Sequence, residues 1–294
     1  SDESARAEQR YGIRERRVFS QSRGTMAEDF IYMGVAFTCG LEKVILPFVD
    51  RGTPVEYELV RSISTITQQK RKRIGVLQTD AQLYGQFNMQ AMSSSPDWPI
   101  IAELEKQYEV VKVDATSPIT ESYDALLAVQ PSSLAPPQWD NFMAAIQAGQ
   151  PTVIFEDPFP VFAPSVPATL APRRAPGGGN PMMMMQQQQQ PPEKTNPQQM
   201  ASLWGMLGVE MSPNQIIWQK YNPYPAASHF PEEFVFVDEG AGKDLEPFAA
   251  ADSGPGASIS AGLQHMLFPF PGAISPLNAS NMEFTVLART GENT

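Results

Sequence analysis

The sequence has a single cysteine, Cys39, and only two histidines, His229 and His265. One cysteine cannot form an internal disulfide, and it excludes metal centres built on several thiolates. Serine and cysteine hydrolases need a nucleophile on a tight strand-to-helix turn, together with a nearby histidine. Because no Gly-x-Ser-x-Gly or Gly-x-Cys-x-Gly run occurs, the sequence does not indicate this kind of catalysis.

Positive charge and long apolar runs are also scarce. The formal net charge is -11, which argues against nucleic-acid binding, because phosphate binding needs a concentrated positive field. No Gly-x-Gly-x-x-Gly or Gly-Lys-[Ser/Thr] motif predicts a phosphate-binding loop. The chain lacks an apolar run of about 18 residues, which a membrane helix would need. Its polar, helix-like start predicts a soluble fragment excised from a longer protein.

Short apolar runs alternate with helical segments between residues 72 and 158. The runs lie at residues 73–79, 108–114, 123–130 and 151–158. The helical segment 137–149 starts with proline and ends with glycine, as helices prefer. Strands that alternate with helices of about a dozen residues are typical of βαβ units and a parallel sheet. The predicted fold class is therefore α/β, with a doubly wound, mostly parallel sheet.

The residues before this sheet predict an attached β-hairpin and helix. Two β-rich runs, 30–38 and 43–49, are joined by a short connection that predicts an antiparallel hairpin. A helix follows from Thr53 to about Gln69. Its apolar positions recur at helical spacing, and we expect them in the core: Val55, Leu59, Ile63 and Ile66. The predicted domains are residues 1–71 and an α/β domain of residues 72–294.

The composition changes after residue 158. Residues 159–197 are rich in proline, glycine, methionine and glutamine, so we predict a mobile, low-complexity insertion. A capped helix is predicted over 196–208. A short helix over 258–266 would contain His265. Strands predicted at 233–238 and 282–289 could extend the parallel sheet.

In open α/β sheets, ligands bind outside the carboxyl ends of the strands. This rule selects the loops 80–96, 131–134 and 156–162 as the likeliest contact surface. The candidate binding residues are Asp80, Tyr84, Gln130, Ser132, Ser133, Glu156 and Asp157. Glu156 and Asp157 could pair as acid and base, but neighbouring strand residues point to opposite faces. The alternative is that Asp157 braces the loop after the strand. No catalytic residue, metal ligand or cofactor is predicted.

Several stretches carry the pattern of a known family. They are Glu42-Lys-Val-Ile-Leu-Pro-Phe48, Val55-Glu-Tyr-Glu-Leu-Val-Arg-Ser-Ile63, Lys72-Arg-Ile-Gly-Val-Leu77, Tyr123-Asp-Ala-Leu-Leu-Ala-Val129 with Pro131, Phe155-Glu-Asp-Pro158 and Gly262-Leu-Gln-His-Met-Leu-Phe-Pro-Phe-Pro-Gly272. Their order resembles the auxiliary component of gliding-motility-type ABC transport systems. The methionine–glutamine insertion departs from the usual pattern of that family.

The resemblance implies a soluble extracytoplasmic (periplasmic) domain at the inner membrane, held by transmembrane segments absent from this chain. It implies a sheet similar to class I glutamine amidotransferase-like and flavodoxin-like folds. It also implies partners among ABC permease and ATPase subunits or envelope proteins, and the family brings no established catalytic residues.

Three functions are compatible with these observations. The first is a non-enzymatic domain that binds a partner or substrate for an ABC transport complex, because the core lacks a convergent nucleophile and base. The second is a hydrolase of envelope glycan or peptide that uses carboxylates such as Asp80, Glu156 or Asp157. The third is a structural spacer, which predicts no concave pocket.

Overall fold

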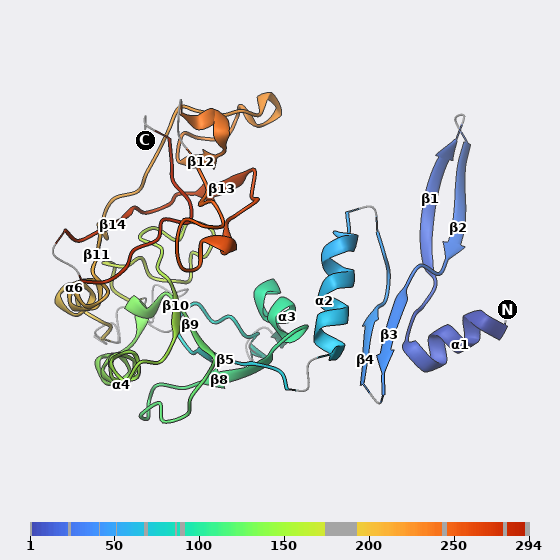
Figure 1. Ribbon diagram of the computed structural model, residues 1–294, viewed down its shortest axis with the longest axis horizontal. Coiled ribbons are helices and arrows are strands. Elements are labelled where there is room, and N and C mark those ends of the chain that lie inside the picture. Colours follow the sequence, from blue (N-terminus) through green and yellow to red (C-terminus); the bar gives the residue numbers. More distant parts are fainter. Residues whose placement is uncertain are drawn as a thin grey trace. The chain divides into compact units, whose positions relative to one another are not determined.

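The computed structural model describes residues 2–22, 25–40, 42–50, 52–67, 70–85, 87–88, 92–173, 193–242, 246–278 and 281–291. The chain divides into two compact units (Figure 1). The first comprises Ser1–Ile74 and Asp97–Val110, and the second comprises Gly75–Pro96 and Val111–Thr294. Within the described ranges, no helix is both long enough and apolar enough to cross a membrane.

The first unit consists of helices and two antiparallel hairpins. Its elements are α1 (Asp2–Tyr11), β1 (Arg16–Ser22), β2 (Thr25–Ile31), β3 (Val35–Cys39), β4 (Glu42–Leu46), α2 (Val55–Thr67) and α3 (Pro99–Glu105). The predicted hairpin is confirmed in β3 and β4, where Val35 pairs with Leu46. The prediction missed the pairing of β1 with β2, to which Phe30 belongs. The run 30–38 is interrupted at Gly34, where a Cβ would lie 2.8 Å from the carbonyl oxygen of Pro47.

The structure buries a different face of α2 from the one predicted. Glu58, Arg61, Ser62 and Thr65 are buried, whereas Val60 is 61% exposed and Ile63 is 52% exposed. Most polar groups on this face are hydrogen-bonded, although the buried Arg61 Nε has no partner among the described residues. The Ser62 hydroxyl donates to the Glu58 carbonyl at 2.6 Å, and the Thr65 hydroxyl donates to the Arg61 carbonyl at 2.8 Å. Apolar spacing therefore identified the helix but not its packed face.

The second unit is built on a four-stranded sheet in the order β10-β9-β5-β8. Its strands are β5 (Arg73–Leu77), β8 (Glu109–Val113), β9 (Ala125–Val129) and β10 (Thr152–Phe155). The sheet is parallel, and helices flank it, so the predicted α/β fold class is confirmed. Among the described strands, β10 lies at the edge of the sheet and pairs with β9 alone, with Thr152 opposite Leu126.

Two helices contribute to the core of the second unit. They are α4 (Pro136–Gln147) and α6 (Pro197–Met206), and both lie close to their predicted ranges. Asn196 caps α6, because its side chain accepts a hydrogen bond from the Gln199 amide at 2.9 Å. The buried core combines side chains of β5, β8 and β9 with Trp139, Phe142, Met143, Met200, Leu203 and Trp204.

The later strands do not extend the parallel sheet, so that prediction is wrong. They form two-stranded antiparallel sheets instead: β11 (Val209–Met211) with β14 (Ile274–Pro276), and β12 (Phe234–Val237) with β13 (Met266–Pro269). β6 (Phe87–Asn88) pairs with β7 (Ser93–Ser94) in a further small sheet. Antiparallel pairs need no crossover helix, and the helices that the described residues form between β11 and β14 are all single-turn 3-10 helices. The described 3-10 helices are η1 (Pro131–Ser133), η2 (Pro225–Ala227), η3 (Glu239–Ala241) and η4 (Ala257–Ile259).

Two further predictions in this region are wrong. The helix predicted over 258–266 stops after η4, because Gly262 adopts a positive φ of 84° that a helix cannot contain. His265 therefore precedes β13 in extended chain. The strand predicted over 282–289 forms only one isolated bridge, between Ala288 and Phe248. Phe284 packs against the core instead.

The insertion predicted over 159–197 is only partly described. Met182–Met185 and Gln186–Gln190 lie outside the described residues. The earlier part of this range departs from the prediction of an unpacked segment, because Val166 and Thr169 are buried. The packing of this segment brings it to the carboxyl edge of the sheet, through the contacts described next.

Candidate functional site

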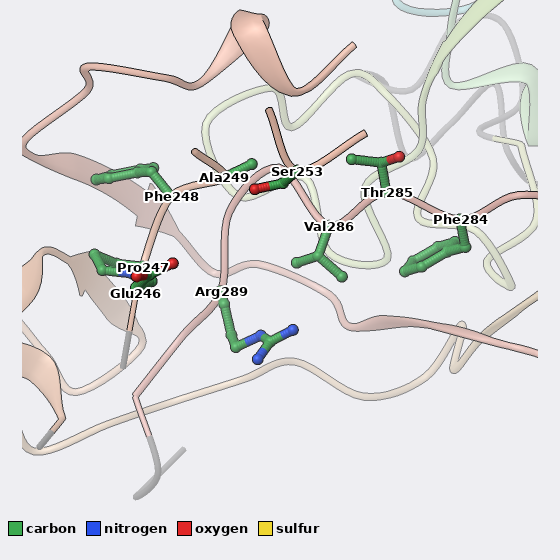
Figure 2. Close-up of a pocket in the computed structure, with 9 residues that line it drawn as sticks. All are labelled: Glu246, Pro247, Phe248, Ala249, Ser253, Phe284, Thr285, Val286 and Arg289. Carbon is green, nitrogen blue, oxygen red and sulfur yellow. The ribbon is translucent and has the colours of Figure 1, made fainter. Parts of the chain in front are cut away.

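A polar hollow of about 530 Å³ lies among the C-terminal segments of the second unit. Figure 2 shows Phe248 and Phe284 on opposite sides of this hollow, with the Arg289 side chain between them in the view. Ser253, Thr285 and Glu246 add polar groups to its wall. None of the residues predicted from the sequence lines it.

The predicted residues gather instead at the carboxyl edge of the parallel sheet. Asp80 follows β5, and its amide donates to the Ser133 hydroxyl at 3.0 Å. The Ser132 amide, in the segment after β9, donates to the Glu156 carboxylate at 3.2 Å. Because parallel strands end at one edge, three loops distant in sequence meet here. All the predicted site residues except Tyr84 belong to this network.

Gln130 ties two of these loops together. Its side-chain amide donates to the carbonyl oxygens of Asp157, at 3.0 Å, and Pro167, at 3.1 Å. Its side-chain oxygen accepts from the Asp157 amide at 3.0 Å. The residue is buried and has a left-handed φ of 54°, a conformation that costs energy and persists only where the surroundings hold it. Gln130 is therefore committed to bracing the fold.

The Glu156 carboxylate is held by the neighbouring loops. It accepts a hydrogen bond from the Thr169 hydroxyl at 2.5 Å, in addition to that from Ser132. Burial raises the pKa of Glu156, while hydrogen bonds from Ser132 and Thr169 and the charge of Lys194 act in the opposite direction. Burial lowers the pKa of the Lys194 ammonium, which donates to the Ala168 carbonyl at 2.8 Å.

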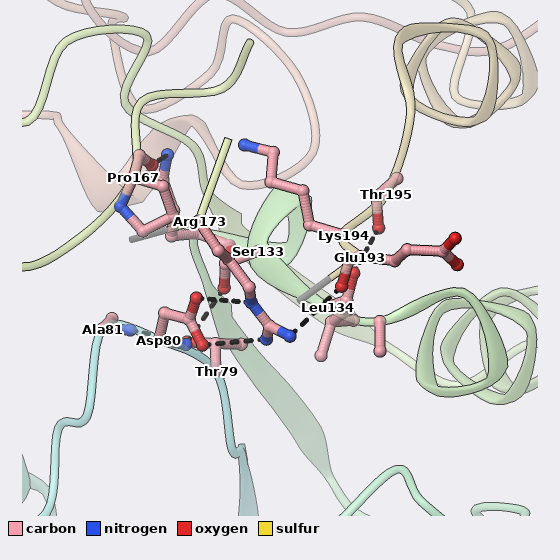
Figure 3. A network of polar contacts seen from close by, with 12 residues as sticks. Thr79, Asp80, Ala81, Ser133, Leu134, Pro167, Arg173, Glu193, Lys194 and Thr195 are labelled. Carbon is pink, nitrogen blue, oxygen red and sulfur yellow. Dashed lines mark hydrogen bonds and ion pairs between the residues drawn. The ribbon is translucent and has the colours of Figure 1, made fainter. Parts of the chain in front are cut away.

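An ion pair closes the network on the side of Asp80. Figure 3 shows the Arg173 guanidinium facing the Asp80 carboxylate in a two-pronged contact, with N–O distances of 2.7 and 2.8 Å. Arg173 also donates to the Glu193 carbonyl at 3.3 Å. The Thr195 hydroxyl donates to the Leu134 carbonyl at 3.0 Å. Sequence reasoning missed Thr169, Arg173 and Lys194, because all three lie in the range taken as low complexity.

Tyr84 and the histidines lie apart from this network. The Tyr84 ring lies 4.2 Å from the Lys112 ammonium and lines a separate hollow of about 180 Å³. His265 lies 3.6 Å from the Asp238 carboxylate, and the His229 ring packs on Phe230. Asp157 accepts from the Phe159 amide at 2.8 Å, which is the loop-bracing role given above as the alternative.

The raised pKa of Glu156 predicts a measurable pH dependence. A carboxyl whose pKa is raised by folding stabilises the protein below its ordinary value, near 4.5, and this contribution is lost as the pH rises through the folded value. Glu156→Gln cannot ionise. We expect the variant to gain stability relative to the native chain as the pH rises above 4.5, by at most about 1.4 kcal/mol per pH unit. Urea unfolding of both proteins from pH 4.5 to 8 measures the difference, and a difference independent of pH would contradict the prediction.

A second hollow of about 530 Å³ lies beside the edge strand β10. We call it the β10 groove; it is lined by Ile154, Phe155, Glu156, Asp157, Pro158, Trp204, Leu207, Val209, Met211, Phe268, Pro269, Phe270, Pro271, Gly272, Ala273 and Ile274. Phe155 is 54% exposed. Trp204 is buried, and its indole N–H has no hydrogen-bond partner among the described residues. The walls of the groove are therefore mostly apolar.

The groove was not predicted as a site, although Glu156 and Asp157 belong to both it and the polar network. Its walls come from β10, α6, β11 and the β13–β14 connection. Phe270 packs there against Phe234, with ring centres 5.6 Å apart. The sequence analysis predicted that later strands continue the sheet, and such strands would cover the edge of β10. An open groove was therefore not predicted from the sequence.

A family model described as an ABC-type uncharacterized transport system matches residues 71–294. The matched range begins just before β5, and it contains the polar network and the three hollows described above. Neither the curated proteins nor the solved structures compared with the chain gave a match. Because the family match covers most of the chain, the protein belongs to this family of auxiliary components of ABC-type transport systems.

Proposed function

We propose that this chain is a non-catalytic docking domain on the extracytoplasmic face of the inner membrane, which binds a partner protein or substrate for the ABC transport complex. The β10 groove is the observation that carries this proposal. Its volume of about 530 Å³ falls within the roughly 300–1,000 Å³ of ligand pockets, and its walls are mostly apolar, as such pockets usually are. The extracytoplasmic placement rests on the resemblance to gliding-motility-type systems.

The polar network supports docking over hydrolysis. A carboxylate hydrolase needs an acid and a base that can approach the scissile bond. Here the Asp80 carboxylate is held by Arg173, and the Glu156 carboxylate is held by Thr169 and Ser132. These groups are used to join loops. The groove also favours docking over a structural spacer, because a spacer needs no concave apolar surface.

Site-specific photo-crosslinking tests the proposal. A photoreactive phenylalanine analogue at Phe155 would place the probe in the groove, and one at Ile259, which is 72% exposed, would serve as the control. In membranes that contain the transport system, we expect Phe155 to give a crosslink to a permease, an ATPase subunit or an envelope protein that Ile259 does not give. Identical products at both positions, or none at Phe155, would refute the proposal.

A further inference from the structure

The outer side of β10 carries backbone groups that none of the described strands uses. The Leu126 amide donates to the Pro151 carbonyl at 2.8 Å, and the Gln130 amide donates to the Phe155 carbonyl at 2.7 Å. In a parallel ladder, alternate residues bond to the same neighbour. Residues 151, 153 and 155 therefore face β9, and Thr152 and Ile154 direct their N–H and C=O groups away from it. Within the described ranges, no strand pairs with this side.

The same stretch of chain lines the β10 groove. Residues 154–158 all contribute to its wall, and Ile154 is the residue of β10 in this set whose N–H and C=O groups point away from β9. Trp204, Phe268 and Phe270 add apolar rings to the same groove. An occupant that pairs with the outward edge of β10 must bring both hydrogen-bond donors and acceptors, because Ile154 presents both an N–H and a C=O group.

We infer that the groove binds an extended peptide segment of a partner protein, which adds to the sheet as a fifth strand beside β10. The inference rests on the proposed docking function and specifies its ligand. Strand addition to an exposed sheet edge is a general mode of peptide recognition, in which the main chain gives affinity and alternate side chains fill pockets. A peptide supplies both donors and acceptors at the spacing of the strand. A hydrocarbon chain would fill the apolar walls but would leave the outward N–H and C=O groups of Ile154 without a partner.

Charge specifies the peptide further. Asp157, two residues after β10, lines the groove, and the whole chain has a net charge of -11. Opposite charge steers association and fixes the orientation of a bound segment. The bound peptide therefore carries lysine or arginine at the end next to Asp157, and apolar side chains where it passes Phe155, Phe268 and Phe270.

Peptide binding to the full chain tests this inference. The probes are fluorescein-labelled nine-residue peptides that alternate valine with threonine and carry two lysines at either the N- or the C-terminal end, so that both strand directions are sampled. Matched peptides are N-methylated on every second amide, in both possible phases, which blocks backbone pairing and keeps the side chains. By fluorescence anisotropy, we expect one unmethylated peptide to bind at least tenfold more tightly than both of its methylated forms.

Variants of the protein locate the binding. Ile154→Pro removes an outward N–H, and edge strands tolerate proline there; we expect at least tenfold weaker binding. Phe155→Ala removes an exposed apolar side chain from the groove wall, and we expect about fivefold to tenfold weaker binding. Ile259→Ala is the matched control and should bind as the native chain does. Circular dichroism and urea unfolding establish that each variant is folded, and the Phe155 variant carries the test if the proline variant is not folded.

The outcomes separate this inference from the proposed function. Equal binding of methylated and unmethylated peptides, or no binding of either at millimolar concentration, would overturn strand addition. If the Phe155 crosslink to a transport component still formed, the docking function would stand without it. If the crosslink also failed, both would be refuted.

Discussion

Replacing Arg61 by alanine is expected to lower the free energy of unfolding of the first unit by about 3–5 kcal/mol, because the change leaves a buried charge without its main partner. The side chains of Arg61 and Glu58 are only 5% and 8% exposed, and their N–O distance is 2.5 Å. Lys106 lies 3.4 Å from the same carboxylate and stays in place, which favours the lower end of this range. Hydrogen exchange of the α2 amides, measured by mass spectrometry, reports the loss locally.

The same ion pair makes the free energy of unfolding depend on pH in the acidic range, and the direction of this dependence follows from the pKa of Glu58. Burial alone would raise the pKa of Glu58, but the hydrogen bond and charge of Arg61, with Lys106, lower the pKa below its ordinary value of 4.5. A lowered carboxyl pKa stabilises the folded state above the ordinary value, and this contribution is lost as the pH falls through the folded value. The Arg61→Ala variant should lose part of this acid dependence.

An exposed ion pair provides the control. Arg17 pairs with Glu28 on the first hairpin, and the two side chains are 56% and 39% exposed. Such pairs contribute about 0–1 kcal/mol, because water and salt screen them. Arg17→Ala should therefore change the stability by less than about 1 kcal/mol. Equal effects of the two alanine substitutions would show that the α2 pair is not buried in solution.

In α2, the spacing of apolar residues correctly predicted a helix but not which face of that helix is buried. The apolar residues Val55, Leu59 and Ile63 recur at helical spacing, and the helix forms where this spacing predicts. Its buried face is nevertheless polar, because Glu58 and Arg61 neutralise one another and the hydroxyls of Ser62 and Thr65 bond to the helix backbone. The sequence alone does not show which tertiary surface such a polar face will meet.

More of the polar network at the carboxyl edge of the sheet than of the β10 groove could be predicted from the sequence. Topology alone brings the residues after β5, β9 and β10 together, so Asp80, Gln130 and Glu156 were identified without coordinates. Their partners Arg173 and Lys194 were not identified, because they lie in the range 159–197, whose composition predicted a low-complexity segment and not a packed one. The β10 groove depends on a sheet that stops at β10, with β11 pairing to β14 instead. Tertiary packing determines this strand pairing, and no local sequence pattern predicts it.

Phe142→Ala is expected to lower the free energy of unfolding of the second unit by about 3–5 kcal/mol, because it removes a large side chain from a close-packed interior. Phe142 on α4 is 0% exposed, and its ring packs edge-to-face on Trp139 with 5.9 Å between ring centres. Urea unfolding followed by circular dichroism at neutral pH measures the loss. A loss below about 1 kcal/mol would contradict the observed packing.

Phe155 provides a matched phenylalanine in the same unit, and the comparison separates stability from docking. Its side chain is 54% exposed and lines the β10 groove, so Phe155→Ala removes little buried surface and should cost less than about 1 kcal/mol of stability. It should nevertheless weaken peptide binding, because the apolar wall is lost. The opposite result, strong destabilisation by Phe155→Ala, would mean that this side chain is packed within the fold. The groove would then be part of the core, and the edge of β10 would have no surface to offer a partner.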